Sequence, residues 1–270
     1  MHQHLTAKPF AELIEQNKKI TYAEENSSTE SRVAGKLRYY YGWLVAAVLL
    51  LFVALPLMIV LRVINRPRWL YPWCLWGART WLTACGARVK VSGLENLKEG
   101  ESYVFASNHR SYLDTAALFA YTGRRIGLVA KKELLKVPIL GQGMGFVNII
   151  AINRTNPEKA LQSMKKARRV MDEGYSFGVF AEGTRALPGE LLPFKKGAFH
   201  LALQTQAPVV PVAFKNTDSM MGKRTGVAHA GTIEMVLLPP IETKNLSVEN
   251  DLMDLLKRTR AAIAEELSRE

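Results

Sequence analysis

One uninterrupted apolar segment constrains the fold of this chain more than any other feature. Residues 39–61, YYYGWLVAAVLLLFVALPLMIVL, contain no charged side chain between Arg38 and Arg62. A helix of about 20 residues crosses the hydrocarbon core of a bilayer, so this segment is long enough to span it. A cleaved signal peptide has a shorter apolar region nearer the start. A buried core helix is normally shorter and amphipathic, and we therefore expect membrane insertion.

A second apolar stretch follows directly at residues 69–87, WLYPWCLWGARTWLTACGA, with Arg79 as its only charge. It is rich in tryptophan, which prefers the headgroup level, so we expect a helix in the membrane interface. A Trp-rich helix packed on the rest of the protein is the alternative. Basic residues flank both ends of the first segment equally, which leaves the positive-inside rule undecided. A hairpin that enters and leaves from one face, helped by a bend at Pro56, accounts for this tie.

From residue 87 onward, short apolar runs alternate with helical periodicity. The helices that we expect include one after an Asn156 N-cap, starting at Pro157, and a last one over 248–268. The expected strands are 87–93, 102–107, 125–130, 147–152, 176–182, 209–214 and 232–238. This alternation predicts an α/β fold with a central, mostly parallel sheet flanked by helices, preceded by a membrane-embedded two-helix hairpin. The predicted divisions are a polar extension (1–36), the anchoring hairpin (37–87) and the α/β domain (88–270).

Composition narrows the classes of partner and cofactor. The net charge of +12 points to an anionic partner, which is a phospholipid surface, a phosphorylated substrate or a nucleic acid. Nucleic acid does not account for the apolar hairpin, and no recognisable binding module supports it. Five histidines without an HExxH or paired CxxC pattern predict no metal site. Two cysteines cannot form a disulfide scaffold, which fits a reducing compartment.

The segment SNHRSYLD, residues 107–114, follows an expected strand and carries the first chemical motif. On an ideal helix His109 and Asp114 would lie about 140° apart. They meet if His109 lies in the turn and Asp114 in the first helical turn. Asp114 would then accept from the imidazole Nδ1–H, fix the tautomer and leave Nε2 as a general base. The alternative for such a pair is a helix-capping network.

The segment FAEGTR, residues 180–185, ends another strand and carries the second motif. Backbone N–H groups around Gly183 and Thr184, beside Arg185, suit a phosphate or an oxyanion. Glu182 could bind a hydroxyl or hold Arg185, and the alternative is a turn with a surface ion pair. Arg154 follows a further strand and is a candidate phosphate ligand by charge and fork geometry, or simply an exposed arginine.

Together these residues resemble the glycerolipid acyltransferase family, in particular bacterial 1-acyl-sn-glycerol-3-phosphate acyltransferases. The family's sequence blocks correspond in order to Asn108-His109-x4-Asp114, the glycine-punctuated stretch that ends in Ile152-Asn153-Arg154, Glu182-Gly183-Thr184-Arg185, and the strand Val209–Val212. The third block usually begins Phe-Pro, and Ala181 stands in place of that proline. The replacement removes no charged or nucleophilic group.

The resemblance implies an enzyme, a 1-acylglycerol-3-phosphate O-acyltransferase of phospholipid biosynthesis. It would move an acyl group from acyl carrier protein or coenzyme A to the sn-2 hydroxyl of lysophosphatidic acid, giving phosphatidic acid. His109 would be the general base, oriented by Asp114. The substrate-binding residues that the resemblance implies are Asn108, Lys132, Arg154, Glu182, Gly183, Thr184 and Arg185, of which Arg154, Arg185 and Lys132 would hold the acceptor phosphate.

The resemblance also implies the setting of the reaction. No cofactor is expected beyond the thioester co-substrate. The expected partners are the phospholipid bilayer, lysophosphatidic acid and the acyl donor, at the cytoplasmic face of the bacterial inner membrane. Two alternatives stay open. The acceptor could be glycerol-3-phosphate or another lysolipid, or the chain could be a non-catalytic membrane module that binds anionic lipid.

Overall fold

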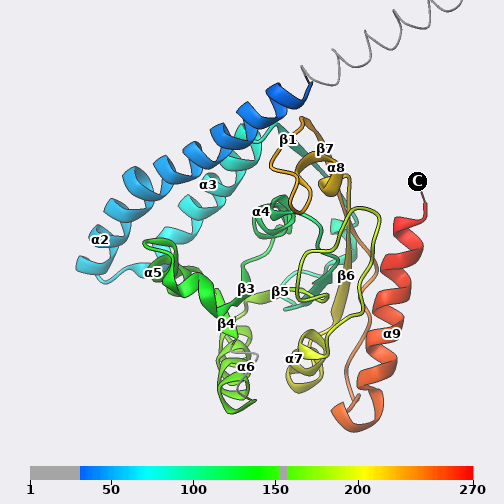
Figure 1. The fold of residues 1–270 in the computed structure, drawn as a ribbon. Coiled ribbons are helices and arrows are strands. Elements are labelled where there is room, and N and C mark those ends of the chain that lie inside the picture. Colours follow the sequence, from blue (N-terminus) through cyan, green and yellow to red (C-terminus); the bar gives the residue numbers. More distant parts are fainter. Residues whose placement is uncertain (1–30, 153–156, 270) are drawn as a thin grey trace, which may run out of the picture.

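The computed structural model describes residues 31–152 and 157–269, so residues 1–30 of the predicted extension lie outside it. A seven-stranded sheet forms the centre, in the order β1-β7-β6-β2-β5-β3-β4 (Figure 1). The strands are β1 (Ala87–Ser92), β2 (Val104–Ser107), β3 (Ile126–Lys131), β4 (Ile150–Ile152), β5 (Ser176–Phe180), β6 (Val209–Lys215) and β7 (Gly231–Leu237). Every adjacent pair is parallel except β6–β7. The α/β class, the mostly parallel sheet and all the expected strands are confirmed.

Helices cover both faces of the sheet and enclose two hydrophobic cores. The helices that follow the first one are α3 (Leu70–Ala84), α4 (Tyr112–Tyr121), α5 (Leu140–Met144), α6 (Pro157–Asp172), α7 (Gly197–Thr205), α8 (Thr217–Met221) and α9 (Val248–Leu267). Alternation along β2 divides its side chains between the cores, because successive side chains point to opposite faces. Phe105 joins the core under α3 and α4, whereas Val104 and Ala106 join the core under α6, α7 and α9. The starts of α6 and α9 agree with the sequence, and Asn156 lies outside the described residues.

The first apolar segment is one helix, Ser31–Val63, which begins earlier than the predicted hairpin. Only 11% of its most apolar window is buried, so it is no core helix. Its middle section, Leu49–Ala54, is π-helical and leads into α2 (Leu55–Val63) just before Pro56. Proline has no N–H and its ring crowds the carbonyl four residues back, which accounts for the altered winding at this point. A 3-10 turn, Pro67–Trp69, then reverses the chain into α3.

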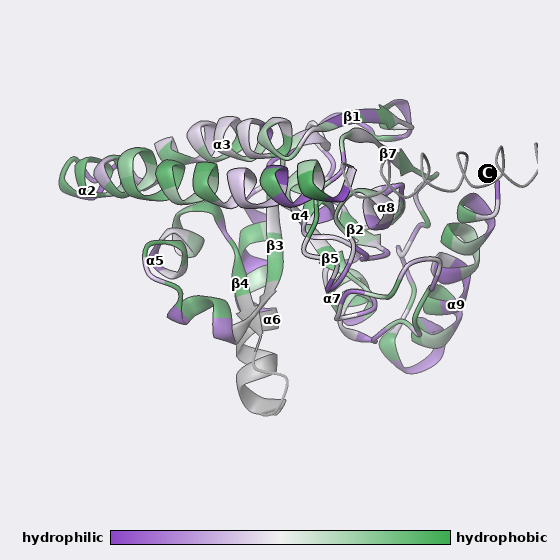
Figure 2. Ribbon diagram, turned by 45° about the horizontal axis from the view of Figure 1, so that its top comes forward, coloured by the Kyte–Doolittle hydropathy of each residue, from purple (hydrophilic) through white to green (hydrophobic). Residues whose placement is uncertain are grey.

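Helix α3 packs on the domain along one face, which is the alternative reading of the second apolar stretch. Tyr71 and Leu82 are buried in the core beneath α3 and α4. On the same helix Trp73 and Trp76 are about half exposed, and Trp69 just before it is 61% exposed. We call Ser31–Val63 and α3 the N-terminal hairpin. The ribbon of the first helix is mostly hydrophobic (Figure 2), and many large apolar side chains of the hairpin are exposed. One face of α3 therefore packs on the domain while its tryptophans face outward.

The first helix runs alongside α3 (Figure 1). Near its start, Arg38 Nη1 donates to the carbonyl of Ala228 at 3.2 Å, and the Ala228 N–H donates to the carbonyl of Gly35 at 2.9 Å. Near its end, Met58 packs in a cluster that includes Phe146. Both ends of the helix therefore contact the domain. If the exposed face of the helix enters a bilayer, its two ends lie on the same side of that bilayer.

Candidate active site

The start of helix α4 brings the residues of the first motif together. Strand β2 ends at Ser107, and α4 begins at Tyr112 with Ser111 as its N-cap. The Ser111 hydroxyl accepts from the Leu113 N–H, and Asp114 accepts from the Ser111 N–H at 2.8 Å. This capping box satisfies backbone donors that the helix itself leaves unpaired. It also fixes the Asp114 side chain beside the turn that holds His109.

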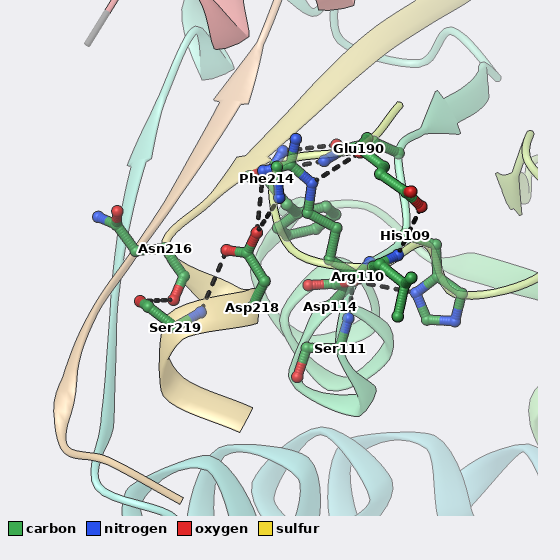
Figure 3. A network of polar contacts seen from close by, with 12 residues as sticks. His109, Arg110, Ser111, Asp114, Glu190, Phe214, Asn216, Asp218 and Ser219 are labelled. Atoms are coloured by element: carbon green, nitrogen blue, oxygen red, sulfur yellow. Dashed lines mark hydrogen bonds and ion pairs between the residues drawn. The ribbon is translucent and has the colours of Figure 1, made fainter. Parts of the chain in front are cut away.

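Asp114 contacts the imidazole as well (Figure 3). His109 Nδ1 lies 2.9 Å from Asp114 Oδ2, which also accepts the Arg110 N–H at 2.7 Å. A carboxylate that takes backbone donors acts as acceptor, so Nδ1 carries the ring proton. The imidazole stacks on Phe180, with ring centroids 4.0 Å apart, and 14% of the His109 side chain is exposed. The capping network and the His–Asp contact, two readings that the sequence left open, therefore coexist on one carboxylate.

Asn108 fixes the backbone that precedes His109. Its amide Nδ2 donates to the carbonyl of Phe214 at 3.0 Å, and its Oδ1 accepts the Phe214 N–H at 2.8 Å. The side chain is fully buried. This reciprocal pair ties the end of β2 to β6, so the structure places Asn108 beneath the turn and its polar atoms on the backbone of the neighbouring strand.

Glu182 joins the second motif to the first. One oxygen accepts the His109 N–H at 2.7 Å, and the other accepts the Leu192 N–H at 2.7 Å. The side chain is 1% exposed, and this burial raises the pKa of Glu182 above its ordinary value although both hydrogen bonds oppose the shift. Its oxygens thus hold two backbone segments and make no ion pair with Arg185.

The turn after β5 presents Arg185 beside the imidazole segment. Gly183 has a positive φ of 73°, and its N–H donates to the carbonyl of Phe180 at 3.0 Å. That N–H is therefore engaged in the turn and is not a free oxyanion donor. Thr184 is exposed and Arg185 is half-buried. The Ala186 N–H donates to the carbonyl of His109 at 2.7 Å, which joins the two loops directly.

Ala181 forms a hydrogen bond that the usual proline could not form. Its N–H donates to the carbonyl of Ser107 at 3.0 Å, and its side chain is 1% exposed. Proline lacks this donor. The bond joins β5 to β2 directly behind the two motifs, so the turn remains anchored without the stiffness that proline would supply.

Arg110 and Asp218 form a buried connection that the sequence did not reveal. Arg110 Nη1 donates to Asp218 Oδ2 at 3.2 Å, and its Nε donates to the carbonyl of Glu190 at 3.0 Å (Figure 3). The Gly189 N–H donates to the same Asp218 oxygen at 3.1 Å. These contacts hold the loop 181–196 against α8. Residues 110 and 218 are far apart in the chain and share no motif, so no local pattern indicates the pair.

Two predicted phosphate ligands cannot be placed. Arg154 lies outside the described residues. Lys132 starts a 3-10 segment that ends at Lys136, and its side chain lies outside the described part of the structure. Over residues 31–152 and 157–269 no cluster of His, Cys, Asp and Glu side chains is suited to a metal ion. The glycine-punctuated stretch borders a pocket of about 310 Å³, whose wall includes Gly141, Gly145 and Lys166.

Comparisons with known proteins show similarity to acyltransferases. Residues 88–215 match the family model described as Acyltransferase. An uncharacterised acyltransferase of Schizosaccharomyces pombe is 40% identical over 179 residues, which cover 65% of this chain and 64% of the relative. The 1-acyl-sn-glycerol-3-phosphate acyltransferase of Limnanthes douglasii is 40% identical over 183 residues, which cover 67% of this chain and 63% of the relative. The chain thus spans less than two thirds of the length of these curated relatives.

A solved structure shares the fold. The crystal structure of the 1-acyl-sn-glycerophosphate acyltransferase from Thermotoga maritima superimposes with a TM-score of 0.73 at 22% identity. The match covers 89% of this chain and 98% of that one.

Proposed function

We propose, from the match of residues 88–215 to the Acyltransferase family model, that the chain acylates the sn-2 hydroxyl of 1-acyl-sn-glycerol-3-phosphate. The acyl group comes from a thioester of acyl carrier protein or coenzyme A, and the product is phosphatidic acid. The single observation that carries the proposal is the 2.9 Å contact between His109 Nδ1 and Asp114 Oδ2. The acceptor is inferred from the Limnanthes relative, whose name specifies it.

His109 acts as the general base in the proposed reaction. With the ring proton on Nδ1 donated to Asp114, the lone pair of Nε2 accepts the proton of the acceptor hydroxyl. The hydroxyl oxygen attacks the thioester carbonyl, the new C–O bond forms, the C–S bond breaks, and the thiolate leaves with the proton from the imidazolium. Asp114 stabilises that imidazolium. General-base assistance of this kind is worth about 10²–10⁴-fold in rate, and no acyl-enzyme is required.

The acceptor phosphate binds to cationic side chains in this proposal. We assign Arg185, in the turn beside His109, to this role, and we add Lys132 and Arg154 on their charge and sequence position alone. A guanidinium suits a phosphate because it donates two parallel hydrogen bonds. Glu182 supports the pocket from below through the backbone at His109 and Leu192. Gly183 and Thr184 shape the turn that carries Arg185, and Asn108 secures the strand end beneath it.

The N-terminal hairpin attaches the enzyme to the bilayer in this proposal. Its exposed apolar side chains include Leu44, Phe52, Trp73 and Trp76. Because both ends of the first helix contact the domain, the hairpin enters and leaves from one face. The proposed location is the cytoplasmic face of the bacterial inner membrane. Cys74 and Cys85 are both free thiols, which fits a reducing compartment.

A panel of acceptors and donors tests the proposal. The purified full chain in mixed micelles is offered lysophosphatidic acid, glycerol-3-phosphate or lysophosphatidylcholine, each with acyl carrier protein and coenzyme A thioesters. We expect phosphatidic acid from lysophosphatidic acid, with a lower KM than for either other acceptor. Preference for another acceptor would reassign the substrate. Binding to anionic vesicles without turnover of any pair would favour the non-catalytic module.

A further inference from the structure

A stack of three side chains connects the N-terminal hairpin to the catalytic loops. Arg185 Cζ lies 3.7 Å from the centroid of the Tyr112 ring. The Tyr112 ring meets the Trp43 ring edge to face, with centroids 5.6 Å apart and planes at 84°. Trp43 belongs to the first helix, Tyr112 is the first residue of α4, and Arg185 follows β5. The stack therefore joins three segments that are distant in the sequence.

The electrostatic setting leaves the charge of Arg185 available to a ligand. Over the described residues, no carboxylate pairs with its guanidinium, and the aromatic face of Tyr112 is the contact that the structure gives it. A cation over an aromatic ring is held by the quadrupole of the ring without being neutralised. Lys223 Nζ donates to the backbone carbonyl of Arg185 and adds a second positive charge nearby. The site thus retains its attraction for an anion.

The depth of the stack is set by the hairpin. Trp43 lies within the uncharged segment and is 39% exposed, and the centroid of its ring also lies 5.9 Å from that of Trp81 of α3. Tryptophan favours the headgroup level of a bilayer. Tyr112, 42% exposed, lies between this tryptophan and Arg185. A guanidinium at the end of such a stack is presented where the phosphate of a lysolipid lies.

We propose that Trp43 and Tyr112 are positioning residues, which hold the Arg185 guanidinium at headgroup depth for the acceptor phosphate. This inference rests on the proposed function, because it gives the hairpin a task in that reaction. The hairpin then sets the affinity for the lipid acceptor and is more than an attachment to the membrane. Neither side chain touches the reacting atoms. Substituting either one should therefore change the KM for the acceptor and leave kcat and the KM for the donor unchanged.

Substitution of Tyr112 is the first test. Tyr112→Leu removes the ring and should raise the KM for lysophosphatidic acid by about 3- to 30-fold, the range that a cation–π contact supports. The values of kcat and donor KM should stay within about twofold. Tyr112→Phe keeps the ring and should restore the wild-type KM. An unchanged acceptor KM in Tyr112→Leu, or a fall in kcat alone, would overturn the proposal.

The hairpin end of the stack has a matched control. Trp43→Leu should also raise acceptor KM. Trp73→Leu removes a tryptophan that is 51% exposed and whose ring contact is with Trp76, outside the stack. It should weaken vesicle binding to a similar degree and leave acceptor KM at the wild-type value. Equal effects of both variants on KM would mean that membrane attachment alone matters, which would contradict the positioning role.

A double variant shows whether Tyr112 acts through Arg185. Arg185→Ala should raise acceptor KM more than Tyr112→Leu, and adding Tyr112→Leu to Arg185→Ala should change nothing further. Additive effects would overturn the proposal. If Tyr112→Leu does not fold, the surface variant Trp43→Leu takes its place in the same cycle. If the wild type forms no phosphatidic acid, the proposed function itself is refuted. If the wild type is active and Tyr112→Leu has the same acceptor KM, only this inference is refuted.

Discussion

Single carboxylates perform more than one task in this site. Asp114 Oδ2 receives the imidazole N–H and two backbone N–H groups, so the oxygen that contacts His109 also caps α4. Glu182 divides its two oxygens between the backbone at His109 and at Leu192. Replacing either carboxylate therefore disturbs the backbone together with the chemistry. A clean test of catalysis has to remove the imidazole and leave both carboxylates in place.

The buried Glu182 carboxyl makes stability depend on pH. Burial raises its pKa above the ordinary 4.5, so within the window from 4.5 up to the raised value the folded chain binds more protons than the unfolded one. The stabilising contribution is present below that window and is lost as pH rises through it. The free energy of unfolding of the wild type, relative to Glu182→Gln, should therefore fall as pH rises through the window.

Urea unfolding of both proteins in detergent, from about pH 4 to about pH 8, measures this difference. Glu190→Gln is the control for loss of one charge in the same loop, since Glu190 is exposed. A difference between wild type and Glu182→Gln that stays constant or grows with pH would contradict the account.

At the scale of elements, a glycine contact decides how the hairpin packs. A Cβ added at Gly42 of the first helix would lie 2.6 Å from Cys85 Sγ, just beyond the end of α3. Cys85 is fully buried, so its sulfur has little room to move aside. At Gly77 of α3 an added Cβ meets nothing within 4 Å. The two helical glycines therefore form a matched pair, one at a close contact and one in open space.

Alanine at these two positions should act in opposite directions. Gly77→Ala should stabilise the protein by up to about 1 kcal/mol, because alanine favours the helix. Gly42→Ala should destabilise it by about 1–3 kcal/mol, because the crowded helices must separate. Thermal unfolding in one detergent compares the two variants. Equal shifts of both midpoints would show that the packing of the first helix does not depend on Gly42.

The sequence predicts those elements whose cause is local. Apolar runs of strand length predicted every strand of the sheet. A strand followed by a turn and a helix start indicated how His109 could meet Asp114, and it left a capping network open as the alternative. The sequence could not predict contacts that depend on the order of the strands in the sheet. Arg110 meets Asp218 because β6 lies beside β2 in the sheet, and the same neighbourhood pairs Asn108 with Phe214. Nothing in either sequence segment specifies that adjacency.

At the scale of the whole molecule, the apolar surface of the N-terminal hairpin lies on the same side as the His109 imidazole. Trp43 of the hairpin contacts Tyr112, which lies between His109 and Asp114 in the chain. In the proposed reaction, a lysolipid presents its hydroxyl to His109 while its acyl chain stays in the bilayer. Transfer of that chain to water would cost about 0.8 kcal/mol per methylene. The arrangement removes this cost from the binding step.

The contacts at both ends of the first helix predict one-sided membrane attachment. Epitope tags at Met1 and Glu270 should both be accessible to protease from the same side of sealed vesicles. Detergent-permeabilised vesicles supply the control, in which both tags are cleaved from either side. Protection of one tag and cleavage of the other in sealed vesicles would show that the first helix spans the bilayer, and the hairpin arrangement would be wrong.

The central claim is that His109 takes the proton of a lysolipid hydroxyl, and the rate of phosphatidic acid formation by His109→Ala tests it most directly. The account predicts a fall in kcat of at least about 10²-fold, while vesicle binding and the unfolding midpoint stay at wild-type values. Turnover by His109→Ala within tenfold of the wild type, in the same preparation and with the same acceptor, would contradict it.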